Sequence, residues 1–305
     1  MSGKLNRDRS ETAKAPPFTH LLSSSMHRIS DREKPLVMPA GLWLQLRSRN
    51  PILAWTAFFH AALFLIALGL FMVDTREVMG VNAWIKPMKF MVSITIYLVT
   101  VAWLMRYIER PRWAVGIIAW GISSCMVVEA TLIFMQAGRG VRSHFNVMTP
   151  FDAGVFSIMG LGVIIDSLLM ALMLCLFFRR DVELAPPHLW GIRIGIAMFL
   201  LGGIVGGWMS SQGGHTIGSE DGGPGLPFLN WSMTSGDLRI AHALGLHGLQ
   251  IMPILGWMIS RSRNSENGWL VPTWALKAFG VMYGVMFLLT LLQASQGRAI
   301  NSLWG

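Results

Sequence analysis

The sequence predicts an all-α fold, a polytopic membrane helix bundle of seven transmembrane helices. Two observations support it: charge is scarce and apolar residues run in seven long stretches. The chain is 53% hydrophobic and only 13% charged, whereas a soluble domain carries about 25% charged residues. A helix of ~20 residues, rising 1.5 Å per residue, crosses a ~30 Å hydrocarbon core. The stretches are Ile52–Val73, Pro87–Met105, Trp113–Met135, Phe151–Phe178, Trp190–Met209, Leu238–Ile259 and Pro272–Leu292.

Helices are expected in these stretches because lipid offers no hydrogen-bond partner to the backbone. A helix pairs its N–H and C=O groups within one segment. A membrane barrel would need segments of about 10 residues that alternate apolar and polar side chains. None of the seven stretches alternates in this way.

The distribution of Lys and Arg predicts the topology. The side that would hold the N-terminus carries 16 of these residues outside the helices, and the opposite side carries 5. Cytoplasmic loops are enriched in Lys and Arg, so we expect the N-terminus in the cytoplasm and the C-terminus outside. The net charge of +9 then reflects topology and attraction to anionic lipid, with no nucleic-acid partner. The expected location is a bacterial cell inner membrane.

Three regions are expected along the chain. Residues 1–40 form a flexible basic cytoplasmic tail, because they are polar and contain no apolar core like that of a signal peptide. Met26 and Met38 are further candidate translation starts. Residues 41–51 mix Leu and Trp with Arg and are typical of an interfacial segment. Residues 52–305 form the transmembrane domain.

One outer loop, residues 210–237, stands out by its composition. It carries seven glycines, two prolines and no Lys or Arg. Loops of this length are usually functional or disordered, and the Trp231 and Leu229 side chains favour an ordered loop. We expect it to fold over the outer mouth of the bundle, with Trp231 as an apolar lid.

Polar residues inside the spans predict a functional site. An ionisable group in the membrane costs roughly 2.5–3.5 kcal/mol on insertion scales, so it normally faces the bundle interior or a wet cavity. The third span carries Glu129, the fourth Asp166, and the sixth places several polar groups within a ~140° arc. The predicted ligand or proton site is Glu129, Asp166, Arg239, His242, His247 and Gln250.

Residues in and near the outer loops are candidate additional contributors to this site. They are Arg139, Arg142, His144, Asp152, Trp231 and Gln293. For Glu129 the alternative is a purely structural ion pair with Arg139 or Arg239. Pro253 frees a backbone carbonyl just below the polar groups of the sixth span, so we expect a bend there.

Glycines spaced four residues apart predict close helix packing, because small residues let backbones approach. Examples are Gly191 and Gly195, Gly202 and Gly206 on the fifth span, and Gly280 and Gly284 on the seventh. The same faces make a homo-oligomer a candidate assembly.

Three classes of function remain open from the sequence. The first is binding or transport of a small solute or protons at an outward-facing polar site. The second is a redox protein that binds haem through His60, His242 or His247. The third is a sensor or assembly factor without chemistry. No metal site is expected, since His242 and His247 lie ~140° apart on their helix, and no catalytic residue is assigned because motifs of soluble enzymes are absent.

Overall fold

The computed structural model describes residues 39–108, 110–223, 225–227, 229–263 and 271–300. Residue contacts divide the chain into two units, Met1–Leu42 and Trp43–Gly305, and the helix bundle belongs to the second. The predicted flexible tail falls almost wholly outside the described residues.

The predicted fold class is confirmed: seven helices are long and apolar enough to cross a membrane. A shorter helix, α2 (Pro39–Arg49), precedes them where an interfacial segment is predicted. Its Trp43 ring packs edge-on against Trp55, with centroids 5.0 Å apart. The seven spans are α3 (Pro51–Val73), α4 (Ile85–Met105), α5 (Arg112–Gly138), α6 (Pro150–Leu176), α7 (Pro186–Gln212), α8 (Leu238–Arg263) and α9 (Thr273–Ser295).

Local sequence signals set where two of these helices begin. The side chain of Asn50 accepts a hydrogen bond from the Leu53 amide at 3.1 Å, and a proline follows at the first helical position of α3. Thr149 caps α6 in the same way through the Asp152 amide. Such caps satisfy amides that have no partner within the helix, and proline fits there because its N–H is not needed.

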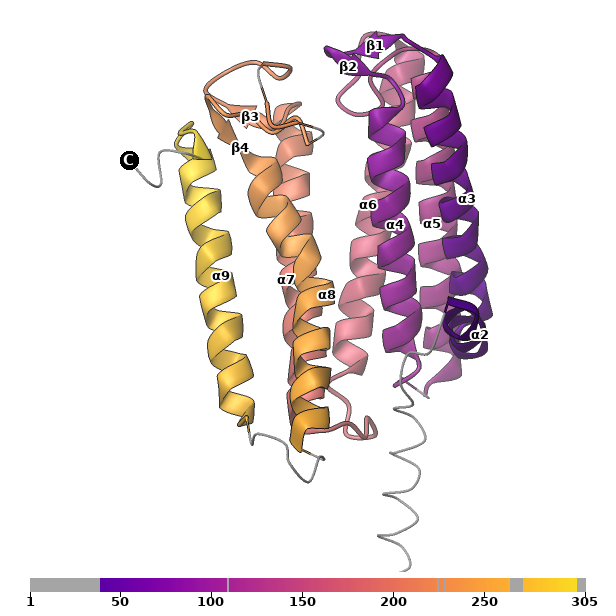
Figure 1. Ribbon diagram of the computed structural model, residues 1–305, viewed down its shortest axis with the longest axis vertical. Helices are drawn as coiled ribbons and strands as arrows, with labels where there is room; N and C mark the ends of the chain where they lie inside the picture. The colour runs from indigo at the N-terminus through magenta and orange to yellow at the C-terminus, as the bar shows by residue number, and fades with distance from the viewer. Residues whose placement is uncertain (1–38, 109, 224, 228, 264–270, 301–305) are drawn as a thin grey trace, which may run out of the picture. The chain divides into compact units, whose positions relative to one another are not determined.

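Two small hairpins lie at one end of the bundle, which we call the hairpin end (Figure 1). β1 (Glu77–Val78) pairs with β2 (Val81–Asn82), and β3 (Thr216–Ile217) with β4 (Gly236–Asp237), both antiparallel. The turn between β1 and β2 holds Met79 and Gly80 at positive φ, as a two-residue hairpin turn requires. Helices α4, α6 and α8 begin at this end, and α3, α5, α7 and α9 finish there.

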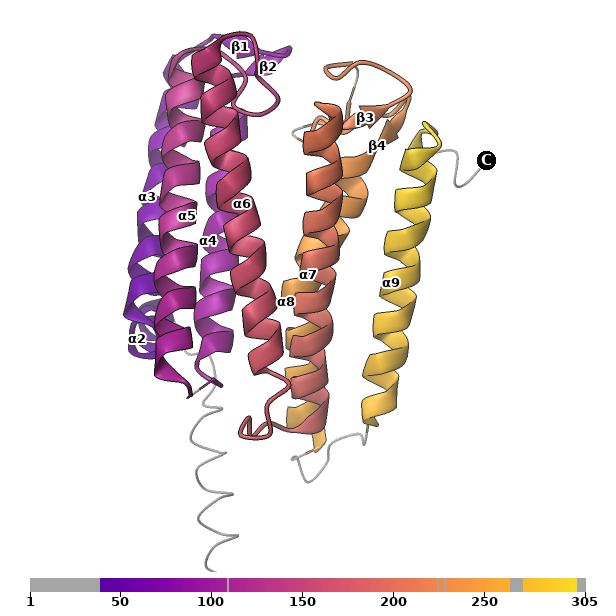
Figure 2. The same ribbon diagram turned by 180° about the vertical axis from the view of Figure 1, so that it is seen from behind.

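The seven spans pack in two groups. In the first group α3, α4 and α5 contact one another and α6 packs on α5; α7, α8 and α9 form the second group. The groups join where α6 contacts α7, as both views show (Figures 1 and 2). Between α4 and α8 the contact is much weaker, so these two helices flank a boundary between the groups.

Glycines bring α7 and α8 together, as the glycine spacing predicts for the fifth span. A Cβ at Gly191 would lie 2.4 Å from the Met252 carbonyl oxygen, and one at Gly202 would meet the backbone of Gly245. At Gly195 the neighbour would be Pro253. The backbones touch because no side chain separates them. These glycines are therefore used within the chain, and the predicted homo-oligomer stays a prediction.

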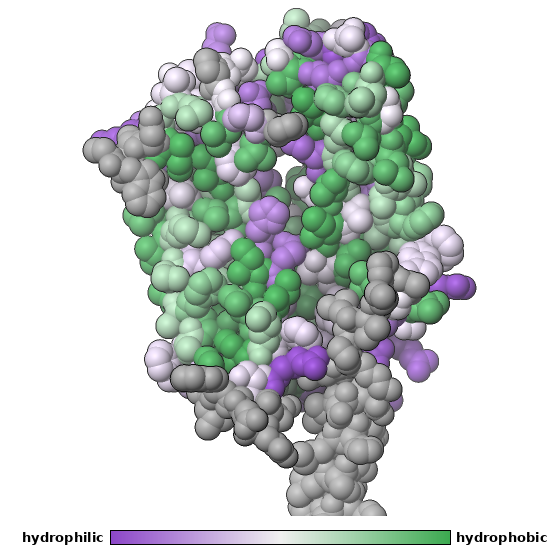
Figure 3. All heavy atoms as spheres, in the orientation of Figure 1, coloured by the Kyte–Doolittle hydropathy of each residue, from purple (hydrophilic) through white to green (hydrophobic). Residues whose placement is uncertain are grey.

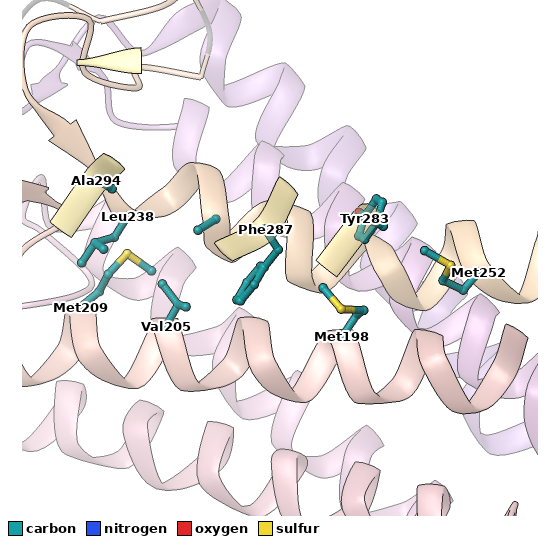
Figure 4. Packing of buried hydrophobic residues seen from close by; sticks show 9 residues of the cluster. Met198, Val205, Met209, Leu238, Met252, Tyr283, Phe287 and Ala294 are labelled. Carbon is teal, nitrogen blue, oxygen red and sulfur yellow. The ribbon is translucent and has the colours of Figure 1, made fainter. Parts of the chain in front are cut away.

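A buried apolar cluster holds the second group together (Figure 4). Met198, Val205 and Met209 of α7 point toward Phe287 and its neighbours on α9. The cluster is completed by Leu238, Ala241, Met252, Tyr283 and Ala294. The Tyr283 hydroxyl donates to the Leu244 carbonyl oxygen at 2.7 Å, so even its polar atom is satisfied by α8.

Candidate functional site

Glu129 on α5 and His144 in the following loop contact each other inside the bundle. The Nε2 atom of His144 lies 3.4 Å from Oε1 of Glu129, and the carboxylate is only 8% exposed. Burial lowers the pKa of His144 well below its ordinary value, and the charge of Lys86 lowers it further. The ring is therefore neutral near pH 7. Its Nδ1 lies 3.1 Å from the Ser143 hydroxyl oxygen, so each ring nitrogen has a polar neighbour.

Aromatic side chains from three elements hold the His144 ring in place. Phe90 of α4 lies 5.3 Å from it between centroids, and Phe156 of α6 lies 6.3 Å away. The next residue, Phe145, has a φ of +57°. A bulky residue in this region is strained, and such strain clusters at functional sites. The strained turn points His144 toward Glu129 while Phe145 packs edge-on against His215, 4.9 Å away.

Lys86 is the cation associated with Glu129. It lies in the first turn of α4, is partly buried, and interacts electrostatically with the carboxylate. Its Nζ lies 5.7 Å from the centre of the Phe90 ring. The second stretch predicted from the sequence begins at Pro87, so Lys86 falls just outside it, whereas the structure includes Lys86 in the helix.

Each arginine considered as a partner for Glu129 is paired with another acid. Arg239 binds the fully buried Asp237 through Nη2 at 2.6 Å and through Nε at 2.9 Å. Its Nη2 also donates to the Asn230 carbonyl oxygen at 2.6 Å. Arg239 thus ties the first turn of α8 to the glycine-rich loop.

A second arginine network lies between α5 and α6. Arg139 Nη1 lies 2.5 Å from Asp152 Oδ1, and Gln136 Nε2 donates to the same oxygen at 2.9 Å. The Thr149 hydroxyl donates to the other carboxylate oxygen at 2.7 Å. These contacts join the end of α5 to the start of α6, so Arg139 and Asp152 are engaged with each other rather than with Glu129.

Polar residues of α4 and α8 face each other across the boundary between the two helix groups. Lys89 and Arg239 interact electrostatically near the hairpin end. Eleven residues further along each helix, Gln250 Nε2 lies 3.4 Å from Thr100 Oγ1. Residues four and eleven positions apart share a helix face. Lys89, Ser93 and Thr100 therefore form one stripe on α4. Arg239, Ala243 and Gln250 form the facing stripe on α8. Figure 3 shows hydrophilic atoms between two hydrophobic flanks on this face, with a hollow toward the hairpin end.

The two histidines of α8 lie on opposite edges of its polar stripe. His242 turns toward α7, where its Nδ1 lies 2.7 Å from the Gly202 carbonyl oxygen and its Cε1 packs over Gly206. His247 is exposed on the other edge. The structure therefore brings Arg239 and Gln250 to the boundary with α4, with His242 directed away from it.

Asp166 lies deeper in the first helix group with a partner that the sequence did not indicate. Both it and Tyr97 are buried, and the Tyr97 hydroxyl donates to Asp166 Oδ1 at 2.7 Å. The Tyr97 ring stacks on Phe199 of α7, with centroids 5.2 Å apart and planes within 2°. This pair joins α4 to α6 and lies within electrostatic range of Glu129.

The glycine-rich loop is ordered by a second acid–histidine pair. His215 Nδ1 lies 2.7 Å from Asp221 Oδ2. Burial favours a raised pKa for Asp221, but hydrogen bonds from His215 and Thr216 outweigh it and lower the pKa. A depression of about 450 Å³ opens beside this turn, lined by Arg142 and by loop residues between Gln212 and Asp221.

The loop also reaches α4. Lys89 Nζ lies 3.4 Å from the Leu229 carbonyl oxygen, so the segment beside Trp231 spans the boundary between the helix groups. Trp231 itself is half-buried, and its role as a lid stays a prediction. Gln293 on α9 is buried and donates to the Arg298 carbonyl oxygen.

His60 is enclosed by backbone. The residue is fully buried, and its ring nitrogens lie 2.7 Å from the Thr56 carbonyl oxygen and 3.1 Å from that of Met126. It connects α3 to α5. A haem ligand would have to give up one of these contacts; the haem assignment stays a prediction from the sequence.

The chain was compared with families, curated proteins and solved structures, and no match was found in any of the three comparisons. Within the described residues, no group of three or more His, Cys, Asp or Glu side chains is placed to hold a metal ion.

Proposed function

We propose that this integral membrane protein binds a small solute between α4 and α8 and passes it along the paired polar stripes. The observation that carries the proposal is the contact of Gln250 with Thr100 in line with Lys89 and Arg239. Polar side chains deep in a membrane bundle are costly unless they meet partners, water or a ligand. Two facing stripes at the boundary of two helix groups supply a path rather than a single buried pair.

The buried acids would serve the same function. Glu129 lies beside the hairpin end of the path through Lys86, and Asp166 lies deeper in the neighbouring group. Protonatable groups at two depths are suited to couple solute movement to protons. The Lys and Arg asymmetry supports placing the hairpin end on the non-cytoplasmic side of a bacterial inner membrane.

The test is whether small solutes stabilise the purified protein and whether Thr100 is needed. The unfolding midpoint, followed by tryptophan fluorescence, is measured with sodium acetate, sodium phosphate, choline chloride and glucose. A ligand that binds only the folded state raises the midpoint. We expect at least one solute class to do so saturably, and Thr100→Val to weaken its effect at least about fivefold.

Thr131→Val is the matched control. Like Thr100, Thr131 donates its hydroxyl to the carbonyl four residues earlier, but it lies on α5 away from α8. It should behave as the wild type. A panel with no effect on the wild type, or equal effects of the two valine variants, would contradict the proposed function.

A further inference from the structure

We infer that the solute is an anion, and that its carboxylate or phosphate group binds at the hairpin end between Lys86, Lys89 and Arg239. This inference rests on the proposed function and specifies its ligand chemistry. It is carried by three observations: a local excess of cations, hydrogen-bond donors that have no acceptor among the described residues, and the direction of two helices.

The excess of cations is centred on Lys86. Three other cations act on it repulsively, namely Lys89, Arg142 and Arg239, whereas Glu129 is the carboxylate that attracts it. Like charges held together in a partly buried site are unfavourable unless a counter-charge is present. A bound anion supplies that counter-charge.

The neighbouring acids are already committed to the protein. Asp237 is fully buried and accepts from Arg239 and from the Ser232 amide at 2.7 Å. Asp221 accepts from the amides of His215 and Thr216, both at 3.0 Å. The oxygens of these two acids are therefore already used in hydrogen bonds that shape the loop and hold Arg239.

Donors remain available among the described residues. The Arg239 guanidinium uses Nε and Nη2 for Asp237 and Asn230, and its Nη1 has no hydrogen-bond acceptor in the part of the chain that the structure describes. Over the same residues the Lys86 ammonium has a ring and a distant charge as neighbours, and no hydrogen-bond acceptor. A guanidinium edge together with an ammonium is a common arrangement for carboxylate and phosphate binding.

Helix direction adds to the same potential. Both α4 and α8 begin at the hairpin end, so the positive ends of two helix dipoles point to the mouth of the path. Lys86 and Arg239 lie in the first turns of these helices. The helix dipoles and the charged side chains of Lys86 and Arg239 thus favour an anion at the hairpin end, between α4 and α8.

The deeper part of the path is uncharged. From Arg239 to Gln250 the helix rises ~16 Å, and the side chains at the deep end are the amide of Gln250 and the hydroxyl of Thr100. The acidic group of the ligand therefore stays at the mouth, and a neutral portion extends toward Thr100. A soluble acid and the headgroup of an anionic lipid share this chemistry.

The experiment uses the full-length protein in phosphatidylcholine nanodiscs. Its unfolding midpoint is measured during titration with sodium phosphate or sodium acetate at constant ionic strength. We expect a saturable rise, with a half-saturating concentration at least about tenfold higher in Lys86→Gln and in Lys89→Gln. Lys277→Gln is the control, because Lys277 lies near the start of α9, at the opposite end, 4.0 Å from the Trp190 ring centre. It should stay within about twofold of the wild type.

A second arm separates the two sources of the anion. Nanodiscs that contain phosphatidylglycerol should raise the midpoint and remove the phosphate response if a lipid headgroup occupies the site, and Lys86→Gln should abolish that rise. A phosphate response that persists in these nanodiscs identifies a soluble acid. Both outcomes support an anion site.

The inference fails if choline or glucose stabilises the protein through Thr100 while phosphate, acetate and phosphatidylglycerol do not. The proposed function would survive that result. It also fails if Lys277→Gln weakens the anion response as much as Lys86→Gln does. If no solute and no lipid has any effect, the inference and the proposed function fall together.

Discussion

The Gln250 amide nitrogen lies 3.4 Å from the Thr100 hydroxyl oxygen and joins two helices of different packing groups. Because α4 and α8 start at the same end and run in the same direction, this contact fixes their relative register. Near the hairpin end, Lys89 and Arg239 interact electrostatically, and Thr100 and Gln250 form an uncharged pair eleven residues further along each helix. In the proposed path, the entrance is therefore charged and the interior is neutral.

The energetic coupling of Thr100 and Gln250 is measurable with a double-mutant cycle. We expect Thr100→Val and Gln250→Leu to show a coupling free energy near 0.6 kcal/mol, the average for hydrogen bonds between membrane helices. A 3.4 Å contact is long, so larger coupling is not expected. The measurement is the free energy of unfolding of the four proteins in detergent. Strictly additive effects would show that the two side chains do not interact.

The Tyr97–Asp166 hydrogen bond should contribute to stability through its buried acceptor. Tyr97→Phe keeps the stacking on Phe199 but removes the donor, which should cost about 1–2 kcal/mol. Asp166→Asn keeps an acceptor oxygen and should cost less. Both values come from unfolding titrations. A neutral Tyr97→Phe together with a severely destabilised Asp166→Asn would point to a different partner for Asp166.

Packing of α7 against α8 should be intolerant of a single methyl group. Gly191→Ala would place a Cβ 2.4 Å from the Met252 carbonyl oxygen, and overpacking of this kind costs about 1–3 kcal/mol. Gly284→Ala on α9 is the control, since nothing lies within 4 Å of its added Cβ. It should be neutral or stabilising by up to about 1 kcal/mol. Equal thermal stability of the two variants would contradict the close approach of the helices.

Stability should fall as the solution becomes mildly acidic, because of His144. Burial lowers its pKa in the folded protein, so below about pH 6.5 the unfolded chain binds a proton that the folded chain does not. Each pH unit in this window costs about 1.4 kcal/mol for one histidine. His215, whose pKa burial also lowers, adds to the slope. Unfolding free energies between pH 7.5 and 5.5 should show a shallower slope in His144→Gln, and parallel slopes would refute this origin.

The fold could be predicted from the sequence because each span carries its own signal. An apolar run of sufficient length must form a helix in lipid, and the structure places every predicted span within a few residues of its expected bounds. Close packing of the fifth span could also be predicted from the sequence, because glycines four residues apart leave one helix face without side chains. Both are properties of single helices.

The partners of the polar residues could not be predicted, because they depend on how helices pair. Helix periodicity placed Glu129 on an interior face, but not opposite His144, whose position depends on the strained Phe145 turn. Tyr97 and Thr100 are two of several polar residues on α4, and only the structure brings them to Asp166 and Gln250. Arg239 remains a predicted site residue, and its observed partner is Asp237, which the sequence analysis did not name.

Water access along α4 is the decisive measurement for a polar path between α4 and α8. Single cysteines at Ser93 and Thr100, in a protein with Cys125 and Cys175 replaced by alanine, are exposed to a membrane-impermeant maleimide in sealed vesicles of known orientation. Met282→Cys on α9 is the control, because Met282 is 60% exposed and lies ~20 Å from the hairpin end of its helix, close to the depth of Thr100. We expect Ser93→Cys and Thr100→Cys to react from the hairpin side only, and Met282→Cys, which faces lipid, not to react. Equal protection of all three positions, or labelling of Met282→Cys at the rate of Thr100→Cys, would contradict a polar path between α4 and α8.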